Sequence, residues 1–222
     1  MSLLNNAASI HTTRFILGVG SRCVIEGRHH LPAPGTPALL AVSHLSHYDP
    51  VVVGGLLRRK IDWLARAEFY RTPAARWACT HCDCIELDRY GHALPGMRQA
   101  LDRLRQGRLV GIFPEGEITV GPESVLRGGP VRGGVALLSR RAQVPIVPCV
   151  VINSDQLRRV TPWLPLKQGR LWISLGQPIM PDPDARPGRA SRRRLADRVA
   201  EALRDVYRSL CDRHDIPPQV GP

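Results

Sequence analysis

Residues 39–50 read LLAVSHLSHYDP, an apolar run that ends in a histidine and an aspartate five positions apart. Leu39–Val42 is typical of a buried strand, and an aspartate followed by a proline is typical of the start of a helix. The sequence therefore predicts a strand, a short turn and a helix that Asp49 caps. His44 and Asp49 share that turn at the carboxyl end of the strand.

The pairing of His44 with Asp49 suits general-base chemistry. A carboxylate can accept a hydrogen bond from one imidazole nitrogen and leave the other nitrogen free to remove a proton from a substrate hydroxyl. This is two thirds of a catalytic triad, and a substrate hydroxyl that attacks directly would replace the missing nucleophile. The alternative from this stretch alone is structural: Asp49 only caps the helix, and His44 only bonds to the backbone.

The rest of the chain alternates between segments typical of strands and segments typical of helices. The predicted strands are 23–26, 39–42, 61–65, 84–87, 109–113, 146–152 and 171–175, and the predicted helices are 50–59, 94–105, 134–141 and 191–210. No linker divides the 222 residues, so we predict a single α/β domain with a mixed, mostly parallel sheet covered by helices. Ligands of such sheets bind beyond the carboxyl ends of the strands, where His44, Arg89 and Glu115 fall.

The chain is strongly basic, with 31 Lys and Arg against 19 Asp and Glu and a formal net charge of +12. This charge favours an anionic partner, which includes nucleic acid, anionic lipid and phosphate-bearing substrates. Aromatic residues make up only 5% of the chain, and neither zinc-finger spacing nor an RNA-binding motif is recognisable. We therefore predict no nucleic-acid partner.

Six cysteines occur without the basic start and apolar core of a secretory signal, which favours a reduced, cytoplasmic setting. Residues 79–84 read CTHCDC, and Cys-x-x-Cys is a metal-ligand spacing. A second matching half is missing, and Cys84 begins a predicted strand. We predict free thiols here, and neither a metal nor a cofactor.

No segment reaches the roughly 20 apolar residues that cross a bilayer, so we predict peripheral contact with the cytoplasmic face of an anionic membrane. Residues 1–22 are a candidate interfacial helix ahead of a single domain over 23–222. Residues 63–77 and the loop 163–166 combine aromatic or apolar side chains with arginines or prolines. The alternative is that these side chains face the core, and that the arginines of the C-terminal helix form a solvated face.

Two blocks together resemble a known family. Residues 43–49 read SHLSHYD and residues 113–116 read FPEG, in this order and about seventy residues apart. They resemble the first and third signature blocks of the glycerolipid acyltransferases, the HX4D family that contains 1-acylglycerol-3-phosphate acyltransferase. The resemblance extends over roughly residues 24–180, and it implies the α/β fold of glycerol-3-phosphate acyltransferase.

The resemblance also implies roles for individual residues. His44 is implied as the general base and Asp49 as its orienting partner. The implied substrate-binding residues are Ser46 in the first block, Arg89 for the acceptor phosphate, Glu115 and Gly116 in the third block, Arg132 before the fourth, and Pro145 beside the acyl group. The Thr-Arg-Ser that usually follows Phe-Pro-Glu-Gly is Glu117-Ile118-Thr119 here, so the family's arginine is absent.

The implied reaction moves an acyl group from acyl-coenzyme A or acyl carrier protein to a lysolipid hydroxyl in phospholipid biosynthesis. The first predicted acceptor is 1-acylglycerol-3-phosphate. Because Glu117 adds an anion near the acceptor, a less charged lysolipid is an alternative. A hydrolase of acyl thioesters and a catalytically silent membrane-binding relative are further alternatives.

Overall fold

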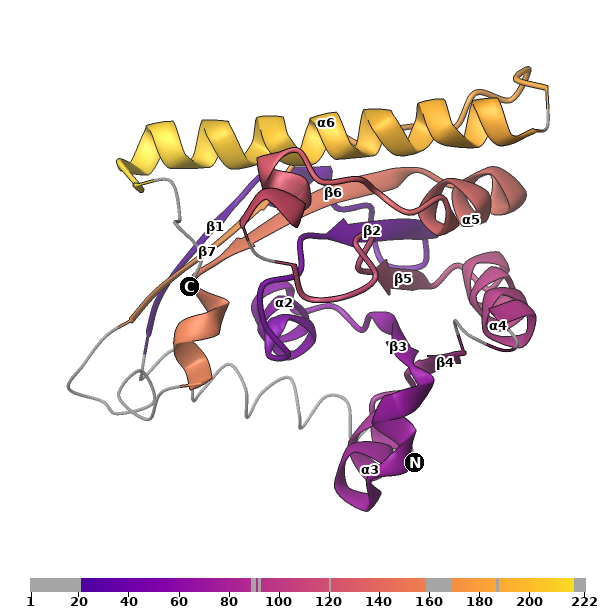
Figure 1. The fold of residues 1–222 in the computed structure, drawn as a ribbon, viewed down its shortest axis with the longest axis horizontal. Helices are drawn as coiled ribbons and strands as arrows, with labels where there is room; N and C mark the ends of the chain where they lie inside the picture. The colour runs from indigo at the N-terminus through magenta and orange to yellow at the C-terminus, as the bar shows by residue number, and fades with distance from the viewer. Residues whose placement is uncertain are drawn as a thin grey trace.

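The structure is a computed structural model that describes residues 21–88, 91, 93–119, 121–158, 169–186 and 188–217. Seven strands form one sheet in the order β1-β7-β6-β2-β5-β3-β4 (Figure 1). They are β1 (Ser21–Glu26), β2 (Ala38–Val42), β3 (Asp62–Arg66), β4 (Ile85–Leu87), β5 (Leu109–Ile112), β6 (Ile146–Ile152) and β7 (Gly169–Leu175). Neighbouring strands run parallel except β6 and β7, which are antiparallel. The predicted mixed, mostly parallel sheet is confirmed.

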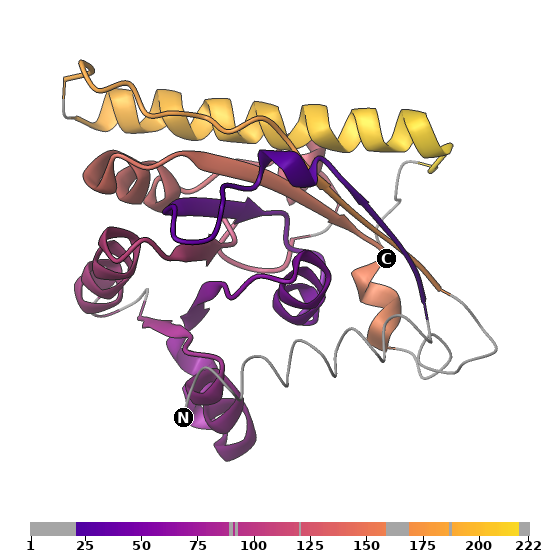
Figure 2. The same cartoon turned by 180° about the vertical axis from the view of Figure 1, so that it is seen from behind.

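Helices cover both faces of this sheet. They are α2 (Asp49–Leu57), α3 (Pro73–His81), α4 (Ala93–Arg105), α5 (Gly134–Ala142) and α6 (Arg189–His214). The apolar residues of α4, α5 and α6 form one core with one face of the sheet, and those of α2 form a second core with the other face. The long helix α6 lies across β1, β7 and β6 (Figure 2).

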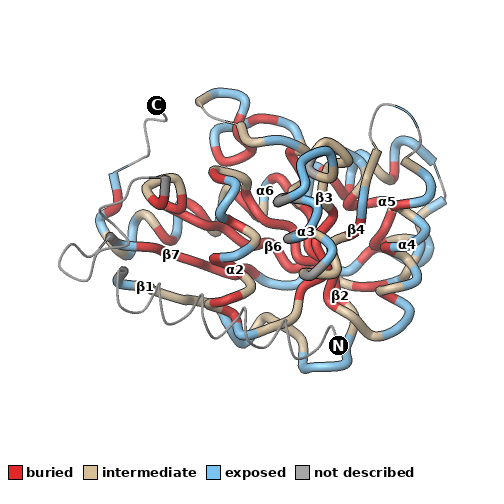
Figure 3. The backbone as a smooth tube through the Cα atoms, turned by 90° about the horizontal axis from the view of Figure 1, so that it is seen from below, coloured by how far each residue is buried: buried red, intermediate tan, exposed pale blue. Residues whose placement is uncertain are grey.

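Strand β2 occupies the centre of the sheet, and every residue of Ala38–Val42 is fully buried (Figure 3). Leu39 and Ala41 belong to the core beneath α4, α5 and α6, whereas Leu40 and Val42 belong to the core beneath α2. A strand buried on both faces must be apolar without alternation, which explains the continuous run of the sequence. Each buried leucine contributes about 1.5 to 3 kcal/mol, so β2 is a firm base for the turn that follows it.

The sequence did not predict helix α3, which overlaps only the last five residues of the 63–77 stretch that combines aromatic residues with arginines. Three other predicted features, residues 1–20, Arg89 and the loop 163–166, lie outside the described residues. Within the described part of the chain, no helix is long and apolar enough to cross a bilayer.

Candidate active site

The turn after β2 is anchored to the neighbouring strand β6. The Ser43 N–H donates to the Cys149 carbonyl at 3.0 Å, and the Ser43 hydroxyl accepts from the Val151 N–H at 3.2 Å. Both bonds are made at the carboxyl end of β2, because β2 and β6 are parallel and in register from Leu39 to Val42. His44 is therefore held at the sheet edge where ligands of parallel sheets bind.

His44 and Asp49 are hydrogen-bonded to each other. The distance from His44 Nδ1 to Asp49 Oδ2 is 2.9 Å, and the N–H groups of Leu45 and Ser46 donate to the same oxygen, each at 2.9 Å. The Asp49 side chain is fully buried, and the His44 side chain keeps 12% of its surface exposed. An ionised carboxylate only accepts hydrogen bonds, so Nδ1 carries the imidazole proton and Nε2 is the basic nitrogen.

The structure corrects the predicted helix cap. Tyr48 is the N-cap of α2, and Asp49 is its first helical residue with Pro50 next. The Asp49 carboxylate turns back to the 44–46 backbone and to the imidazole instead of capping the N–H groups ahead of it. The alternative in which Asp49 only caps the helix and His44 only bonds to the backbone does not hold, because the Asp49 carboxylate is hydrogen-bonded to the imidazole.

An aromatic stack supports the imidazole from the neighbouring strands. The His44 and Phe113 rings stack with centroids 3.9 Å apart and an interplanar angle of 21°, and Trp63 stacks behind Phe113 at 5.0 Å and 10°. A Cβ atom at Gly111 would lie 2.4 Å from the Trp63 ring, so only glycine leaves room for the stack. The sequence offered Trp63 as a membrane contact or as a core-facing residue, and the structure buries it in this stack.

Glu115 is buried, and its carboxylate holds its own loop together. Oε2 accepts from the Thr119 hydroxyl at 2.6 Å, and Oε1 accepts from the Val125 N–H at 3.1 Å. Burial raises the pKa of Glu115 to about 7, although the hydrogen bonds from Thr119, Val125 and His44 oppose the rise. The Thr119 N–H also donates to the His44 carbonyl at 3.4 Å. Glu115 thus fastens the Phe-Pro-Glu-Gly loop beside His44, and it does not line the cavity described below.

This buried carboxyl group predicts a pH-dependent stability. Its folded pKa of about 7 lies above the unfolded value of about 4.3, so the folded protein binds the proton more tightly, and the free energy of unfolding falls as the pH rises between these values. Glutamine does not titrate, so the Glu115→Gln variant does not lose stability in this way. Its free energy of unfolding minus that of wild type should increase by about 2 kcal/mol from pH 5 to pH 7.5. Urea denaturation at both pH values measures this, and a constant difference would contradict the assignment.

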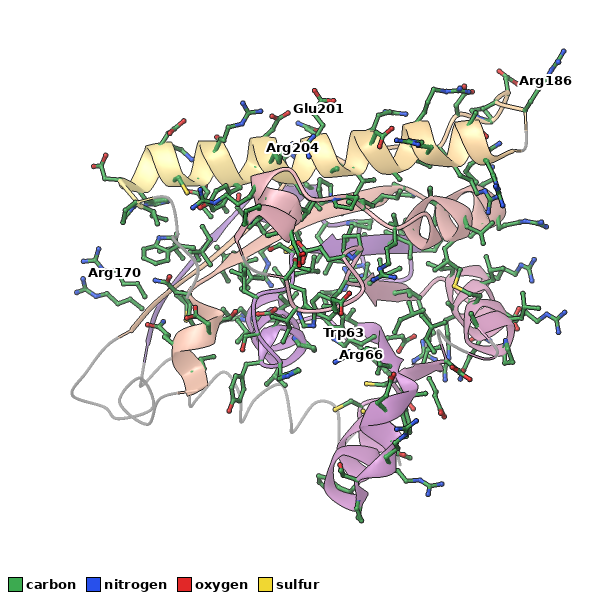
Figure 4. All side chains as sticks on the ribbon, in the orientation of Figure 1. Trp63, Arg66, Arg170, Arg186, Glu201 and Arg204 are labelled. Atoms are coloured by element: carbon green, nitrogen blue, oxygen red, sulfur yellow. The ribbon has the colours of Figure 1, made fainter. Side chains whose placement is uncertain are left out.

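A cavity of about 700 Å³ opens beside the aromatic stack. It is lined by His44, Trp63 and Phe113 from the stack and by apolar side chains such as Val51, Ile61, Leu64, Leu87 and Met97. Four cations reach its wall: Arg59, Lys60, Arg66 and Arg132. Figure 4 shows Trp63 and Arg66 on β3, close to α3. The cavity has the size and apolar lining of a site for a ligand with a long hydrocarbon part and an anionic group.

Of the remaining residues predicted for the site, only some lie at the cavity. Gly116 and Arg132 line the cavity. Ser46 is buried in the turn, where its hydroxyl accepts from the Tyr48 N–H at 3.3 Å. Pro145 directly precedes β6 and lies at the amino ends of the strands, which is the edge opposite His44. Its position does not support contact with the substrate. The side chain that sequence reasoning overlooked is Arg66, at the carboxyl end of β3.

Gly116 has a structural duty in this loop. Its φ of 82° lies in the left-handed region that favours glycine, and its N–H donates to the Phe113 carbonyl at 2.9 Å. That N–H is therefore engaged within the turn itself. The turn itself aims Glu117 toward Arg132: Arg132 Nη2 donates to Glu117 Oε1 at 2.9 Å, and Arg132 Nε donates to the Glu115 carbonyl at 2.7 Å.

The comparison with known families agrees with this geometry. A family model described as Acyltransferase matches residues 22–152, which is more than half of the chain. The chain belongs to this acyltransferase family. The match begins at β1 and ends at β6, so it contains both signature blocks. The resemblance to the glycerolipid acyltransferases is thereby confirmed.

Comparison with individual proteins shows which members of the family the chain resembles. The chain is 29% identical over 202 residues to 1-acyl-sn-glycerol-3-phosphate acyltransferase alpha of Bos taurus, covering 86% of this chain but only 64% of that relative. It is 23% identical over 167 residues to the Bacillus subtilis 1-acyl-sn-glycerol-3-phosphate acyltransferase, covering 75% of this chain and 78% of the relative. The crystal structure of the 1-acyl-sn-glycerophosphate acyltransferase PlsC from Thermotoga maritima shares the fold, with a TM-score of 0.62, 19% identity and coverage of 91% and 81%.

Proposed function

We propose that the protein transfers an acyl group from an acyl thioester to a hydroxyl of a lysolipid, with 1-acylglycerol-3-phosphate as the first acceptor. The observation that carries this proposal is the His44–Asp49 pair on the wall of a large apolar cavity. Relatives that bear the name of this activity support it. The donor is acyl-coenzyme A or acyl carrier protein, and the cavity contributes no feature that selects between them.

The proposed reaction begins with proton removal. His44 Nε2 accepts the proton of the acceptor hydroxyl as its oxygen attacks the thioester carbonyl, and Asp49 stabilises the imidazolium that forms. The tetrahedral intermediate then collapses, the carbon–sulfur bond breaks, and the imidazolium returns the proton to the leaving thiolate. Arg66 and Arg132 are the proposed partners of an anionic headgroup, because both line the cavity and guanidinium groups bind phosphate in a bidentate manner.

A purified-enzyme assay tests this function. Free thiol release from acyl-coenzyme A or acyl carrier protein is measured with and without lysolipid, and the lipid product is identified by mass spectrometry. Thiol release that needs the acceptor and yields a diacyl lipid supports the transferase. Thiol release without acceptor would identify a hydrolase, and absence of turnover with every donor would identify a non-catalytic relative.

One observation favours a second candidate acceptor, a lysolipid with less negative charge. Glu117 pairs with Arg132, which lines the cavity, so it offsets a cation that a phosphomonoester needs. The chain is also 26% identical over 196 residues to an N-acylphosphatidylethanolamine synthase of Arabidopsis thaliana, covering 79% of this chain and 64% of that relative. A lysophosphodiester carries one negative charge on its phosphate, where a phosphomonoester carries nearly two.

Replacing Glu117 and Ile118 together should shift the acceptor preference. Glu117→Thr with Ile118→Arg frees Arg132 and adds a cation, and a hydrogen bond to a charged group contributes about 1.5 to 3 kcal/mol. The ratio of kcat/KM for 1-acylglycerol-3-phosphate to kcat/KM for a lysophosphodiester should rise about tenfold or more. Glu123→Thr, an exposed acid outside the cavity lining, is the matched control. An unchanged ratio would mean that residues 117 and 118 do not face the acceptor.

We also propose that the rim of the cavity rests on an anionic membrane. Val51, Trp77 and Leu94 are 48%, 64% and 68% exposed, Val51 and Leu94 line the cavity, and Arg71 and Arg76 are exposed near Trp77. Binding to vesicles should rise with anionic lipid and fall with salt. Trp77→Ser with Leu94→Ser should weaken binding, whereas Met180→Ser, which is exposed away from this rim, should not. Equal binding to neutral and anionic vesicles at every salt concentration would contradict the proposal.

A further inference from the structure

Three cysteine side chains, Cys79, Cys82 and Cys84, lie on the same cavity wall as His44, although the proposed reaction uses none of them. All three are half-buried and occur as free thiols. In the part of the chain that the structure describes, no three His, Cys, Asp or Glu side chains converge as metal ligands. The chemistry that these side chains offer to a molecule in the cavity is that of the thiol itself.

Two of these thiols are brought together by the local fold. Cys79 lies in the last turn of α3, and Cys84 directly precedes β4. The Cys84 N–H donates to the Cys79 carbonyl at 2.9 Å, and Asp83 makes the reversal between them with a positive φ of 54°. The Cys84 carbonyl accepts from the Tyr70 hydroxyl at 3.0 Å, which ties this corner to the segment before α3. The two cysteines are therefore neighbours through backbone contacts.

The side chains of this pair are chemically unequal. The neighbouring side chain of Cys84 lowers the pKa of Cys79 to about 7, against the opposing effects of burial and of Glu86. The neighbouring side chain of Cys79, together with burial, raises the pKa of Cys84. A thiolate is the nucleophile in thiol chemistry, and a second thiol beside it can resolve the first product.

We infer that Cys79 and Cys84 form a thiol–disulfide exchange site on the wall of the substrate cavity, and that its reaction partner is a small disulfide. The Cys79 thiolate attacks one sulfur of the small disulfide, forms a mixed disulfide and releases one thiolate. That thiolate takes the proton of Cys84, and the Cys84 sulfur then displaces the second small thiol from Cys79. The protein loses two protons and two electrons as a disulfide forms. The small disulfide is reduced to two thiols, the second of which takes from solvent the proton that Cys79 released when it ionised.

Peptide mapping of the wild-type protein tests this inference directly. The protein is incubated with oxidised glutathione, remaining thiols are blocked with iodoacetamide, and trypsin releases residues 77–89, which contain all three cysteines. We expect this peptide to carry one internal disulfide and one blocked thiol, with fragmentation placing the bond between Cys79 and Cys84 and the block on Cys82. A bond from Cys82 to either neighbour, or a peptide with three blocked thiols, would overturn the inference.

Variants separate the two roles and a rate measurement adds a second readout. After oxidised glutathione, Cys82→Ser should still form the Cys79–Cys84 disulfide. Cys79→Ser should form no glutathione adduct, and Cys84→Ser should retain a mixed disulfide between Cys79 and glutathione. At pH 7 the wild-type Cys79 should react with iodoacetamide about tenfold faster than Cys211, which lies outside the cavity lining and whose pKa burial raises. Equal rates would overturn the assignment of Cys79 as the attacking thiol, even if a variant failed to fold.

The effect on turnover is a separate measurement, and it alone rests on the proposed acyl transfer. Both residues line the cavity, so a mixed disulfide with glutathione at Cys79 should occupy space that the substrate needs. Activity of Cys84→Ser should fall at least fivefold after oxidised glutathione relative to its own untreated sample, and dithiothreitol should restore it. Unchanged turnover of Cys84→Ser that carries glutathione on Cys79 would overturn the placement of the exchange site on the wall of the substrate cavity. Absence of turnover in untreated protein would count against the proposed function only.

Discussion

His44→Ala is expected to lower acyl transfer by about 10² to 10⁴. The substitution removes Nε2, which is the only basic nitrogen that the Asp49 pair directs toward the cavity. It leaves the anchoring bonds of Ser43 to β6 and the Leu45 and Ser46 bonds to Asp49 in place. Turnover should fall while lysolipid affinity, measured by equilibrium binding, stays within about twofold.

His29→Ala is the control for this experiment. His29 is exposed and does not line the cavity, so its removal should leave the rate unchanged. If the purified His44→Ala protein is folded by circular dichroism and keeps more than a tenth of wild-type turnover, His44 is not the general base.

Asp49→Asn is expected to lower the rate of acyl transfer by a similar factor, for a different reason. A neutral amide cannot stabilise the imidazolium, and it can present its NH2 to Nδ1, which moves the imidazole proton to Nε2 and removes the basic nitrogen. Turnover of the purified variant, measured on protein that circular dichroism shows to be folded, distinguishes a chemical defect from partial unfolding.

The same substitution should also lower stability. Asp49 Oδ1 is buried, and among the described residues it has no hydrogen-bond partner. Whichever oxygen becomes the NH2 group, one buried polar group is left badly matched, at a cost of about 1 to 3 kcal/mol. Urea denaturation measures this loss. A variant with unchanged stability and wild-type turnover would mean that the carboxylate charge matters neither for the fold nor for catalysis.

Much of the fold could be predicted because its signals are local. The buried run Leu39–Val42 and the apolar segment Ile146–Ile152 are complete strands in themselves, and the periodicity of α6 extends over a single long helix. Helix α3 lacked such a signal, because a short run of alanines, arginine and one exposed tryptophan presents no apolar stripe. Its existence depends on packing against the segment before it, which the local sequence does not encode.

The site was only half predictable for the same physical reason. His44 and Asp49 lie five residues apart in one turn, so their spacing alone brings them together. Trp63, Phe113 and Arg66 reach the site through the pairing of β5 with both β2 and β3, which depends on strand order. Pro145 directly precedes β6, whereas His44 follows β2, so the two residues lie at opposite edges of the sheet. The sequence of the fourth signature block does not indicate at which edge its proline lies.

The stack of Phe113 on His44 has a consequence for the order of folding. The two rings belong to segments 69 positions apart, 113 minus 44, and they meet only after β2 and β5 have paired in parallel. Parallel pairing of distant segments is slow, because the entropy of closing the long loop is lost before the contacts form. The turn that holds His44 and Asp49 can assemble early, but the imidazole acquires its aromatic support late. A chain released from denaturant thus regains its helices before it regains a catalytic centre.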